Sequence, residues 1–189
     1  MVDKHTLRKV YLEKRLFLSA SELNHRNQLL SNLLLAKLPM ERSTTIHLFM
    51  GINEKNEVDT FGIMKALMEL QPSVQFVTSK TKPKGILEHY KIDSNTKFEK
   101  NKWHVPEPIG ADMADINEID VVLVPLIIFD KEGNRIGYGM GYYDRFLKLV
   151  PNAAKVGITL GPPLDKIEYV GKYDVAMDAC CTPFKYYEF

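Results

Sequence analysis

The chain has 189 residues, enough for one well-filled domain, and its formal net charge at pH 7 is +1. This balance gives no sign of a nucleic-acid or membrane partner, and no apolar run approaches the roughly 20 residues of a membrane span. The first residues, MVDKHTLRKVYLEKR, are charged and lack the apolar core of a signal peptide. We therefore expect a single domain over residues 1–189 that is cytoplasmic and monomeric and binds neither nucleic acid nor membrane.

Two helices are predicted at the N-terminal end. Residues 3–18 place their apolar side chains near one stripe at helical spacing. Lys4 and Arg8 are four residues apart and project from the same side of this helix, where most basic pairs are simply solvated. Residues 19–22 form a plausible capping box for a second helix. The leucines that we expect this second helix to turn inward are Leu23, Leu30, Leu33 and Leu34.

The next segments alternate between strand-like and helix-like patterns. Residues 45–50 predict a strand, followed by an acidic loop and a helix that turns Ile63 and Leu67 inward, which is half of a βαβ unit. Residues 74–78 and 86–92 predict two more strands. Between them, residues 80–84 predict a compact basic loop, either solvated or able to attract anionic groups of a substrate.

The most informative stretch runs from residue 121 to residue 149. It starts with a β-branched apolar run, residues 121–126, that is typical of a strand buried on both faces. Residues 130–134 then predict a turn inside a short hairpin. After this turn, three alternating glycines in residues 137–141 precede a helical pattern in which Tyr142, Phe146 and Leu149 share a face. The stretch therefore predicts a strand, a hairpin, a glycine-rich loop and a helix.

Three glycines ahead of a helix suit a phosphate-holding loop, because glycine lets backbone N–H groups approach an anion. Arg135 precedes the loop and could reach the same phosphates, and Asp144 is a reasonable Mg²⁺ ligand beside a triphosphate. The alternative is that the glycines only mark a turn and that Asp144 is an exposed acid of the first helical turn. The loop matches neither of the two standard nucleotide-binding fingerprints.

Residues 154–160 predict another buried strand, and the two adjacent cysteines, Cys180 and Cys181, are expected to be small buried residues without a disulfide. The repeated alternation of helix-length and strand-length segments predicts an α/β fold with a mostly parallel sheet and with ligands at the carboxyl ends of its strands.

The run VPLIIFDKEGNRIGYGMGYYDRFL resembles the signature segment of the 5-formyltetrahydrofolate cyclo-ligases, also called 5,10-methenyltetrahydrofolate synthetases. The match includes both aspartates, the arginine, the three glycines and the aromatic pair. Met140 lies where relatives commonly carry glycine or a basic residue, so no role is carried over for its side chain. The resemblance implies a three-layer Rossmann-like fold with helices on both faces of the sheet, shared with some sugar-phosphate isomerases and CoA transferases.

The resemblance also implies an ATP site and a magnesium site. The N-terminal K-x-x-x-R pattern makes Lys4 and Arg8 candidate ATP ligands, and Arg135 and Tyr142 are the candidate catalytic residues. Asp144 and Asp174 are the candidate Mg²⁺ ligands, with Tyr173 where histidine is frequent. The other candidate ATP contacts come from the glycine-rich segment: Gly137, Tyr138, Gly139, Met140, Gly141, Tyr142 and Tyr143.

Further residues are candidate contacts of the folate. Met50 ends the predicted strand, and either Glu57 or Asp59 fits the family's acidic position, although both would equally suit the first turn of the following helix. Trp103 either stacks on the pterin ring or fills the core. The remaining candidates repeat residues of the glycine-rich segment: Tyr138, Gly139, Gly141 and Tyr142.

The activity implied is ATP- and Mg²⁺-dependent closure of 5-formyltetrahydrofolate, possibly polyglutamylated, to 5,10-methenyltetrahydrofolate, with release of ADP and phosphate. Phosphorylation of the formyl oxygen would turn a poor leaving group into one that nitrogen 10 can displace, chemistry that asks a protein mainly for positioning and charge neutralisation. Three alternatives stay open: a non-catalytic folate or nucleotide binder, a paralogue with another acceptor, and a sugar-phosphate isomerase or CoA transferase on the same fold.

Overall fold

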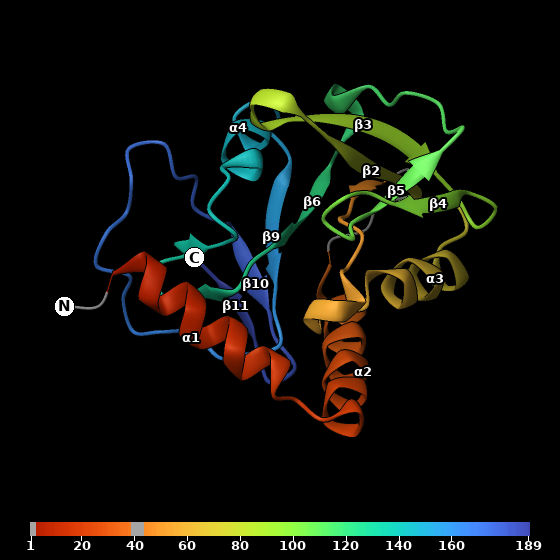
Figure 1. Cartoon of the computed structure of the whole chain (residues 1–189). Coiled ribbons are helices and arrows are strands. Elements are labelled where there is room, and N and C mark those ends of the chain that lie inside the picture. Colours follow the sequence, from red (N-terminus) through yellow and green to blue (C-terminus); the bar gives the residue numbers. More distant parts are fainter. Residues whose placement is uncertain (1–2, 39–43) are drawn as a thin grey trace.

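The computed structural model describes residues 3–38 and 44–189, and a seven-stranded sheet runs through its middle in the order β11-β10-β9-β6-β1-β2-β3 (Figure 1). The strands of this sheet are β1 (Thr45–His47), β2 (Gln75–Lys82), β3 (Ile86–Ile92), β6 (Val121–Pro125), β9 (Ala154–Ile158), β10 (Ala179–Cys181) and β11 (Tyr186–Glu188). The pairings from β10 to β2 are parallel, and β11 and β3 join the two edges antiparallel. The predicted α/β fold with a mostly parallel sheet is therefore confirmed.

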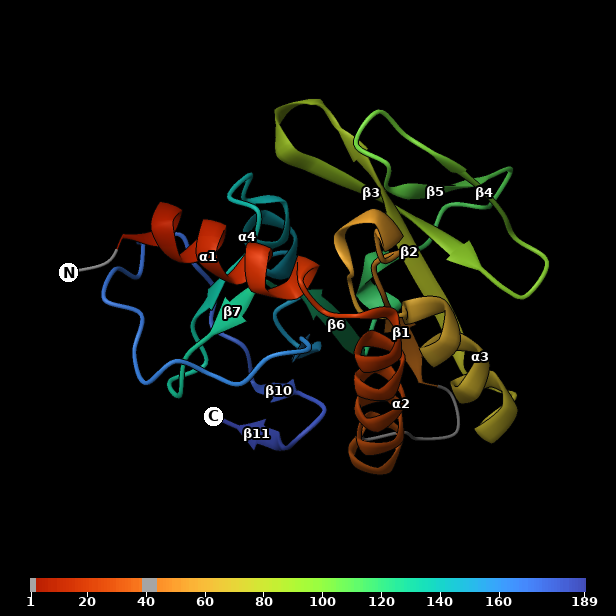
Figure 2. The same cartoon turned by 60° about the horizontal axis from the view of Figure 1, so that its bottom comes forward.

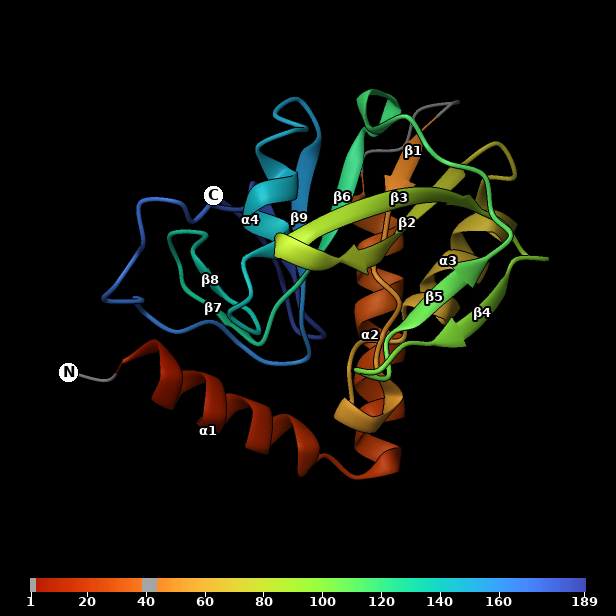
Figure 3. The same ribbon diagram turned by 45° about the horizontal axis from the view of Figure 1, so that its top comes forward.

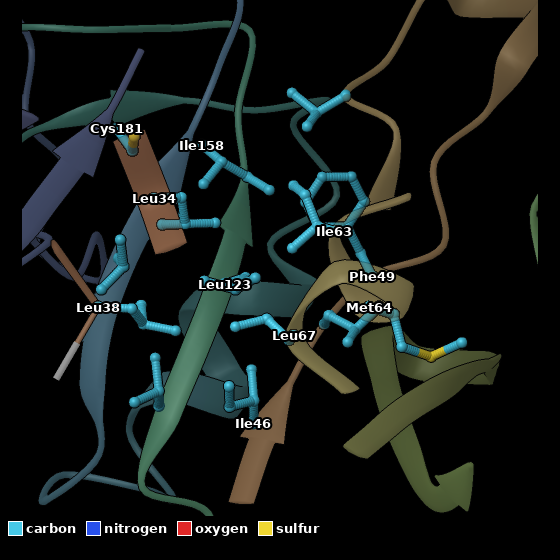
Figure 4. Close-up of a cluster of buried hydrophobic side chains, with 14 of the residues drawn as sticks. Leu34, Leu38, Ile46, Phe49, Ile63, Met64, Leu67, Leu123, Ile158 and Cys181 are labelled. Carbon is cyan, nitrogen blue, oxygen red and sulfur yellow. The ribbon is translucent and has the colours of Figure 1, made fainter. Parts of the chain in front are cut away.

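Helices cover both faces of the sheet. Helices α2 (Ala20–Lys37) and α3 (Thr60–Leu70) lie on one face, and α4 (Tyr142–Leu147) lies on the other. Strand β6 has side chains in both layers, because successive residues of a strand point to opposite sides. Leu123 packs among residues of α2 and α3, as Figure 4 shows, whereas Val122 and Val124 pack with Phe146 of α4.

The serine half of the predicted capping box is confirmed, because the Ser19 side chain accepts a hydrogen bond from the Glu22 N–H at 3.2 Å, whereas the Glu22 carboxylate accepts from Nε of Arg26 at 2.6 Å. Leu30 and Leu34 of α2 are fully buried, and Leu23 and Leu33 pack partly buried against the same core. Cys180 and Cys181 are free and buried.

Helix α1 (Lys4–Leu16) lies apart from α2 and α3 and runs past the hairpin of β7 (Ile128–Phe129) and β8 (Arg135–Ile136), as Figure 3 makes clear. Its side chains Leu7 and Tyr11 pack against the small apolar cluster of this hairpin. Every residue of α1 nevertheless keeps part of its surface exposed. The first helix is thus attached to the sheet by a narrow contact.

A second hairpin, β4 (Lys97–Lys100) and β5 (Pro106–Ile109), lies beside β2 and β3 (Figure 2). Three short 3₁₀ turns complete the regular structure: Asn53–Lys55, Pro83–Gly85 and Ile116–Glu118. Within the described ranges, no helix combines the length and the apolar character that crossing a membrane requires.

Three local predictions are wrong. The strand predicted for residues 45–50 ends at His47, and residues 48–50 continue as buried coil. Lys80 and Lys82 lie inside β2, where they pair with β3, so only Pro83–Gly85 forms the turn of the predicted basic loop. Leu149 is 62% exposed because α4 ends two residues earlier, at Leu147.

Candidate functional site

A cavity of about 900 Å³ opens at the carboxyl ends of β1 and β6, where the alternating fold predicts ligands to bind. Its walls come from α1, the loop after β1, the β2–β3 and β4–β5 hairpins, the loop between β8 and α4, and the segment before β10. These segments are far apart in sequence. All the predicted site residues except Asp59 line this one space.

We call residues 137–141 the glycine loop. Gly139 has a φ of +90° and Gly141 a φ of +67°, and Gly141 is the N-cap of α4. A side chain at Gly139 would also be crowded, because a Cβ there would lie 3.0 Å from Nη2 of Arg8. Arg8 in turn donates a hydrogen bond from Nε to the carbonyl of Gly137 at 2.7 Å. The loop therefore needs glycine for its backbone and for the close approach of a cation from α1.

Arg135 and Asp144, which flank this loop, contact each other. The Nη2 atom of Arg135 donates to Oδ1 of Asp144 at 2.7 Å, and the arginine side chain is only 6% exposed. Asp144 Oδ1 also accepts from the N–H of Val175 at 3.2 Å, while Arg135 Nη1 donates to the Val175 carbonyl. The predicted phosphate-binding arginine and the predicted metal-binding aspartate thus form one partly buried ion pair.

Asp174 forms a second pair, in which Lys4 Nζ donates to its Oδ2 atom. Burial acts to raise the pKa of Asp174, but the hydrogen bonds from Lys4 and from the N–H of Gly171, together with the charges of Lys4 and Arg135, hold that pKa below its ordinary value. The carboxylate is therefore ionised at neutral pH and available to a cation.

The charges of the cavity fit an anion with a divalent ion. Its lining holds six Lys and Arg side chains and three Asp and Glu side chains. Within residues 3–38 and 44–189, no three His, Cys, Asp or Glu side chains are grouped to hold a metal by themselves. Two carboxylates completed by phosphate oxygens and water are the usual environment of Mg²⁺, and Asp144 and Asp174 would supply them. ATP with Mg²⁺ therefore fits the residues present.

The loop after β1 and the β4–β5 hairpin line the cavity with buried and aromatic side chains. Met50 is 3% exposed, and Glu57 is buried with Oε2 accepting from the N–H of Ile52 at 2.8 Å. Asp59 instead caps α3 by accepting from the N–H of Gly62 at 2.9 Å, and the structure does not bring it to the cavity. Trp103 lines the mouth and is 45% exposed, so the alternative that it fills the core is wrong.

The three tyrosines near the loop differ in their environments. Tyr138 donates its hydroxyl hydrogen to Glu57, and Tyr142 donates to the carbonyl of Lys82 at 3.3 Å. Tyr143 is partly buried with its hydroxyl shielded from solvent, and this burial raises the pKa of its phenol, followed by the charge of Glu57. Met140 lines the cavity and has 63% of its surface exposed.

The structure adds cations that the sequence reasoning missed. Lys55 lies over the Tyr138 ring, with 4.4 Å between Nζ and the ring centre, and Lys148 lies 4.8 Å over Tyr173. Arg145 donates from Nε to the Gly85 carbonyl at 2.8 Å and so holds α4 to the β2–β3 turn. Arg145 lies within the signature run, and its place there could have identified it as a candidate site residue. Arg15, whose contacts are described below, carried no such signal.

A model of the 5-formyltetrahydrofolate cyclo-ligase family matches residues 1–183. A 5-formyltetrahydrofolate cyclo-ligase of Mycoplasma pneumoniae is 35% identical over 83% of this chain and 85% of the relative, and one of Mycoplasma genitalium is 33% identical over 84% and 85%.

Two solved structures are similar as well. The 5,10-methenyltetrahydrofolate synthetase of Aquifex aeolicus superposes with a TM-score of 0.82 and 26% identity over 98% of this chain and 92% of that one. The Mycoplasma pneumoniae synthetase superposes with a TM-score of 0.71 and 29% identity over 96% and 99%. With its signature segment folded around the cavity, the chain belongs to the 5-formyltetrahydrofolate cyclo-ligase family.

Proposed function

We propose that this protein converts 5-formyltetrahydrofolate to 5,10-methenyltetrahydrofolate with ATP and Mg²⁺, releasing ADP and phosphate. The observation that carries the proposal is one cavity lined by the glycine loop, by the cations and carboxylates around it, and by aromatic side chains with the buried acid Glu57. ATP would supply the phosphoryl group that lets the formyl oxygen depart as phosphate. The protein itself would bind and orient the two substrates and neutralise the charge of the phosphates.

The end of the cavity near the glycine loop is the proposed nucleotide side. Lys4 and Arg8 would contact phosphates from α1, and the N–H groups of residues 137–141 would do so from the loop. Asp144 and Asp174 would hold Mg²⁺. The Arg135 pair uses Oδ1 of Asp144 and the Lys4 pair uses Oδ2 of Asp174, so each carboxylate has a second oxygen to offer the metal.

The part of the cavity lined by the loop after β1 and by the β4–β5 hairpin is the proposed folate side. Glu57 would accept hydrogen bonds from N–H groups of the pterin, because an ionised carboxylate only accepts. Met50 and Trp103 would contact its flat ring, and Tyr138 and Tyr142 would lie between the two substrates. We assign no folate contact to Asp59, because its side chain caps α3.

The proposal is tested by mixing the purified protein with 5-formyltetrahydrofolate, ATP and Mg²⁺ and following the absorbance band of the methenyl product. Product formation that requires all three additions, with one ADP per product, is the expected result. ATP hydrolysis without the methenyl product would support a paralogue with another acceptor, and folate binding without turnover would support a non-catalytic binder. Omitting Mg²⁺ tests the metal separately.

The monomeric state and the cytoplasmic location stay predictions. Size-exclusion chromatography with light scattering at the assay concentration measures the first, and a mass near 21.7 kDa is expected. A mass twice as large would contradict it.

A further inference from the structure

Arg15, in the last turn of α1, lies where three segments of the cavity wall meet. Its Nε atom donates to the carbonyl of Lys55 at 2.9 Å, in the loop after β1. Its Nη2 atom donates to the hydroxyl of Tyr138 at 2.6 Å, in the glycine loop, and lies 3.6 Å from Oε1 of Glu57. The arginine side chain is 10% exposed and that of Glu57 is 5% exposed. One guanidinium therefore joins α1 to both loops at the proposed folate side.

The hydroxyl of Tyr138 links this arginine to Glu57. It accepts a hydrogen bond from Arg15 and donates one to Oε1 of Glu57. Burial and then the charge of Glu57 raise the pKa of the phenol, so it stays a donor at neutral pH. Because Oε2 of Glu57 accepts from the N–H of Ile52, both carboxylate oxygens are held in one orientation.

The two ends of α1 are attached to the rest of the protein independently. At the C-terminal end, Asn56 donates from Nδ2 to the carbonyl of Arg15 at 3.1 Å, which adds a second tie to the loop after β1. At the N-terminal end, Lys4 pairs with Asp174, and Arg8 donates to the carbonyl of Gly137. A change at Arg15 therefore leaves the contacts of Lys4 and Arg8 in place.

We infer that Arg15 is a positioning residue for the reduced folate. It holds the buried carboxylate of Glu57 and the hydroxyl of Tyr138 in the orientation that receives the substrate, without contacting the reacting atoms. Arginine suits this task because its planar group donates in several fixed directions, whereas lysine directs one ammonium group at one place. This inference rests on the proposed function, in which Glu57 binds the folate.

The test uses Arg15→Lys, which keeps the charge, and Tyr138→Phe, which removes only the hydroxyl, together with their double variant. We expect each single change to raise the KM for 5-formyltetrahydrofolate by about tenfold, the size of one charged hydrogen bond. The same factor is expected in the Kd of 5-formyltetrahydrofolate measured by calorimetry without ATP. The double variant should lose little more than either single one, because the two changes break the same contact chain.

The KM for ATP separates positioning from a general structural role. It should stay within about twofold of the wild-type value in Arg15→Lys, because Lys4 and Arg8 keep their own contacts. Arg26→Lys is the matched control. Arg26 also donates to a distant backbone carbonyl, that of Leu160, but unlike Arg15 it hydrogen-bonds no residue of the cavity lining. We expect this control to leave both KM values unchanged.

Several results would overturn the inference. Unchanged folate KM and Kd in Arg15→Lys would do so, and so would a parallel rise of the folate and ATP values, which indicates a loosened helix. If Arg15→Lys fails to fold, Tyr138→Phe is judged by the same criterion. If the wild-type protein binds the folate but forms no product, the proposed function fails and the Kd values of the variants still decide the role of Arg15. Absence of folate binding overturns both.

Discussion

The two faces of the central sheet are built for different purposes. Under α2 and α3 the sheet meets a layer of aliphatic side chains, and all residues of these two helices lie outside the cavity lining. Under α4 the layer is thinner and includes His47, His89 and Tyr143, whose buried polar atoms find no hydrogen-bond partner among the described residues. Residues of α4 itself line the cavity. The α2–α3 face therefore contributes mainly to stability. The α4 face is less favourably packed, and its helix lines the cavity.

Asp144→Asn should break the function of the α4 face while leaving the fold intact. If the carboxylate holds Mg²⁺, its loss costs several kcal/mol of transition-state stabilisation, or about a hundredfold or more in kcat. Steady-state assays of cyclisation at saturating Mg²⁺ measure this. Asp165→Asn is the control, because Asp165 is an exposed acid paired with Lys131. Near-normal turnover of Asp144→Asn would remove the proposed metal role.

Leu34→Ala should have the opposite effect, on the α2–α3 face. Leu34 is fully buried in the large core, and truncation of such a leucine costs about 3 kcal/mol of unfolding free energy. Leu29→Ala, on the same helix at a position 37% exposed, should cost well under about 1 kcal/mol. Denaturant unfolding measures both. The kcat of the folded Leu34→Ala protein should match the wild type, and a large fall would mean that this face also shapes the site.

The histidine pair of the α4 face should make stability depend on pH. The rings of His47 and His89 lie 5.2 Å apart, and burial lowers the pKa of His89 to about 4 and that of His47 well below its ordinary value. In the unfolded protein each ring takes up a proton near pH 6.5, whereas in the folded protein it stays neutral to a lower pH. The free energy of unfolding is therefore highest above pH 6.5 and decreases as the pH falls toward 4.

His89 alone should account for the loss of about 2 kcal/mol between pH 7.5 and pH 5. Urea unfolding at the two pH values measures this, and His89→Leu should reduce the difference. If wild type and variant show the same pH dependence, the buried ring is not its source.

The smallest expected effect concerns the glycine loop. Gly139→Ala places a Cβ at a φ of +90° and 3.0 Å from Arg8, which should cost about 1–2 kcal/mol in backbone strain and raise the KM for ATP several-fold. Gly110→Ala is the matched control, because Gly110 also has a positive φ, +64°, but has open space around it. It should show a comparable loss of stability with an unchanged KM. Equal ATP KM values in the two variants would contradict a role for the Arg8 contact.

Much of this arrangement was predictable from local sequence patterns. The apolar run of β6, the turn with Gly133 and the glycine loop each have a signal within a few residues, and the signature segment links them to a family. The Ser19 cap was predictable for the same reason. What these features share is that neighbours in sequence determine them.

The remaining features depend on contacts between distant segments. Lys80 and Lys82 have the polar sequence of a loop, because this end of β2 extends beyond the core. It is a strand because its backbone pairs with β3, and side-chain burial gives no signal for that. Glu57 and Asp59 could not be ranked, because only the fold decides which of them reaches the cavity and which caps α3. The partners of Arg15 are 40 and 123 residues away, a separation at which no periodic pattern gives a signal.

The narrow attachment of α1 couples its docking to ligand affinity. The helix contributes little to the hydrocarbon interior but carries Lys4 and Arg8 into the cavity lining and Arg15 against Tyr138 and Glu57, so its docking and ligand binding form one linked equilibrium. Each bound substrate adds to the free energy that keeps the helix in place. Conversely, a substitution of Leu7 or Tyr11, which weakens the apolar contact of the whole helix, lowers the apparent affinity for both substrates even when the sheet beneath is untouched.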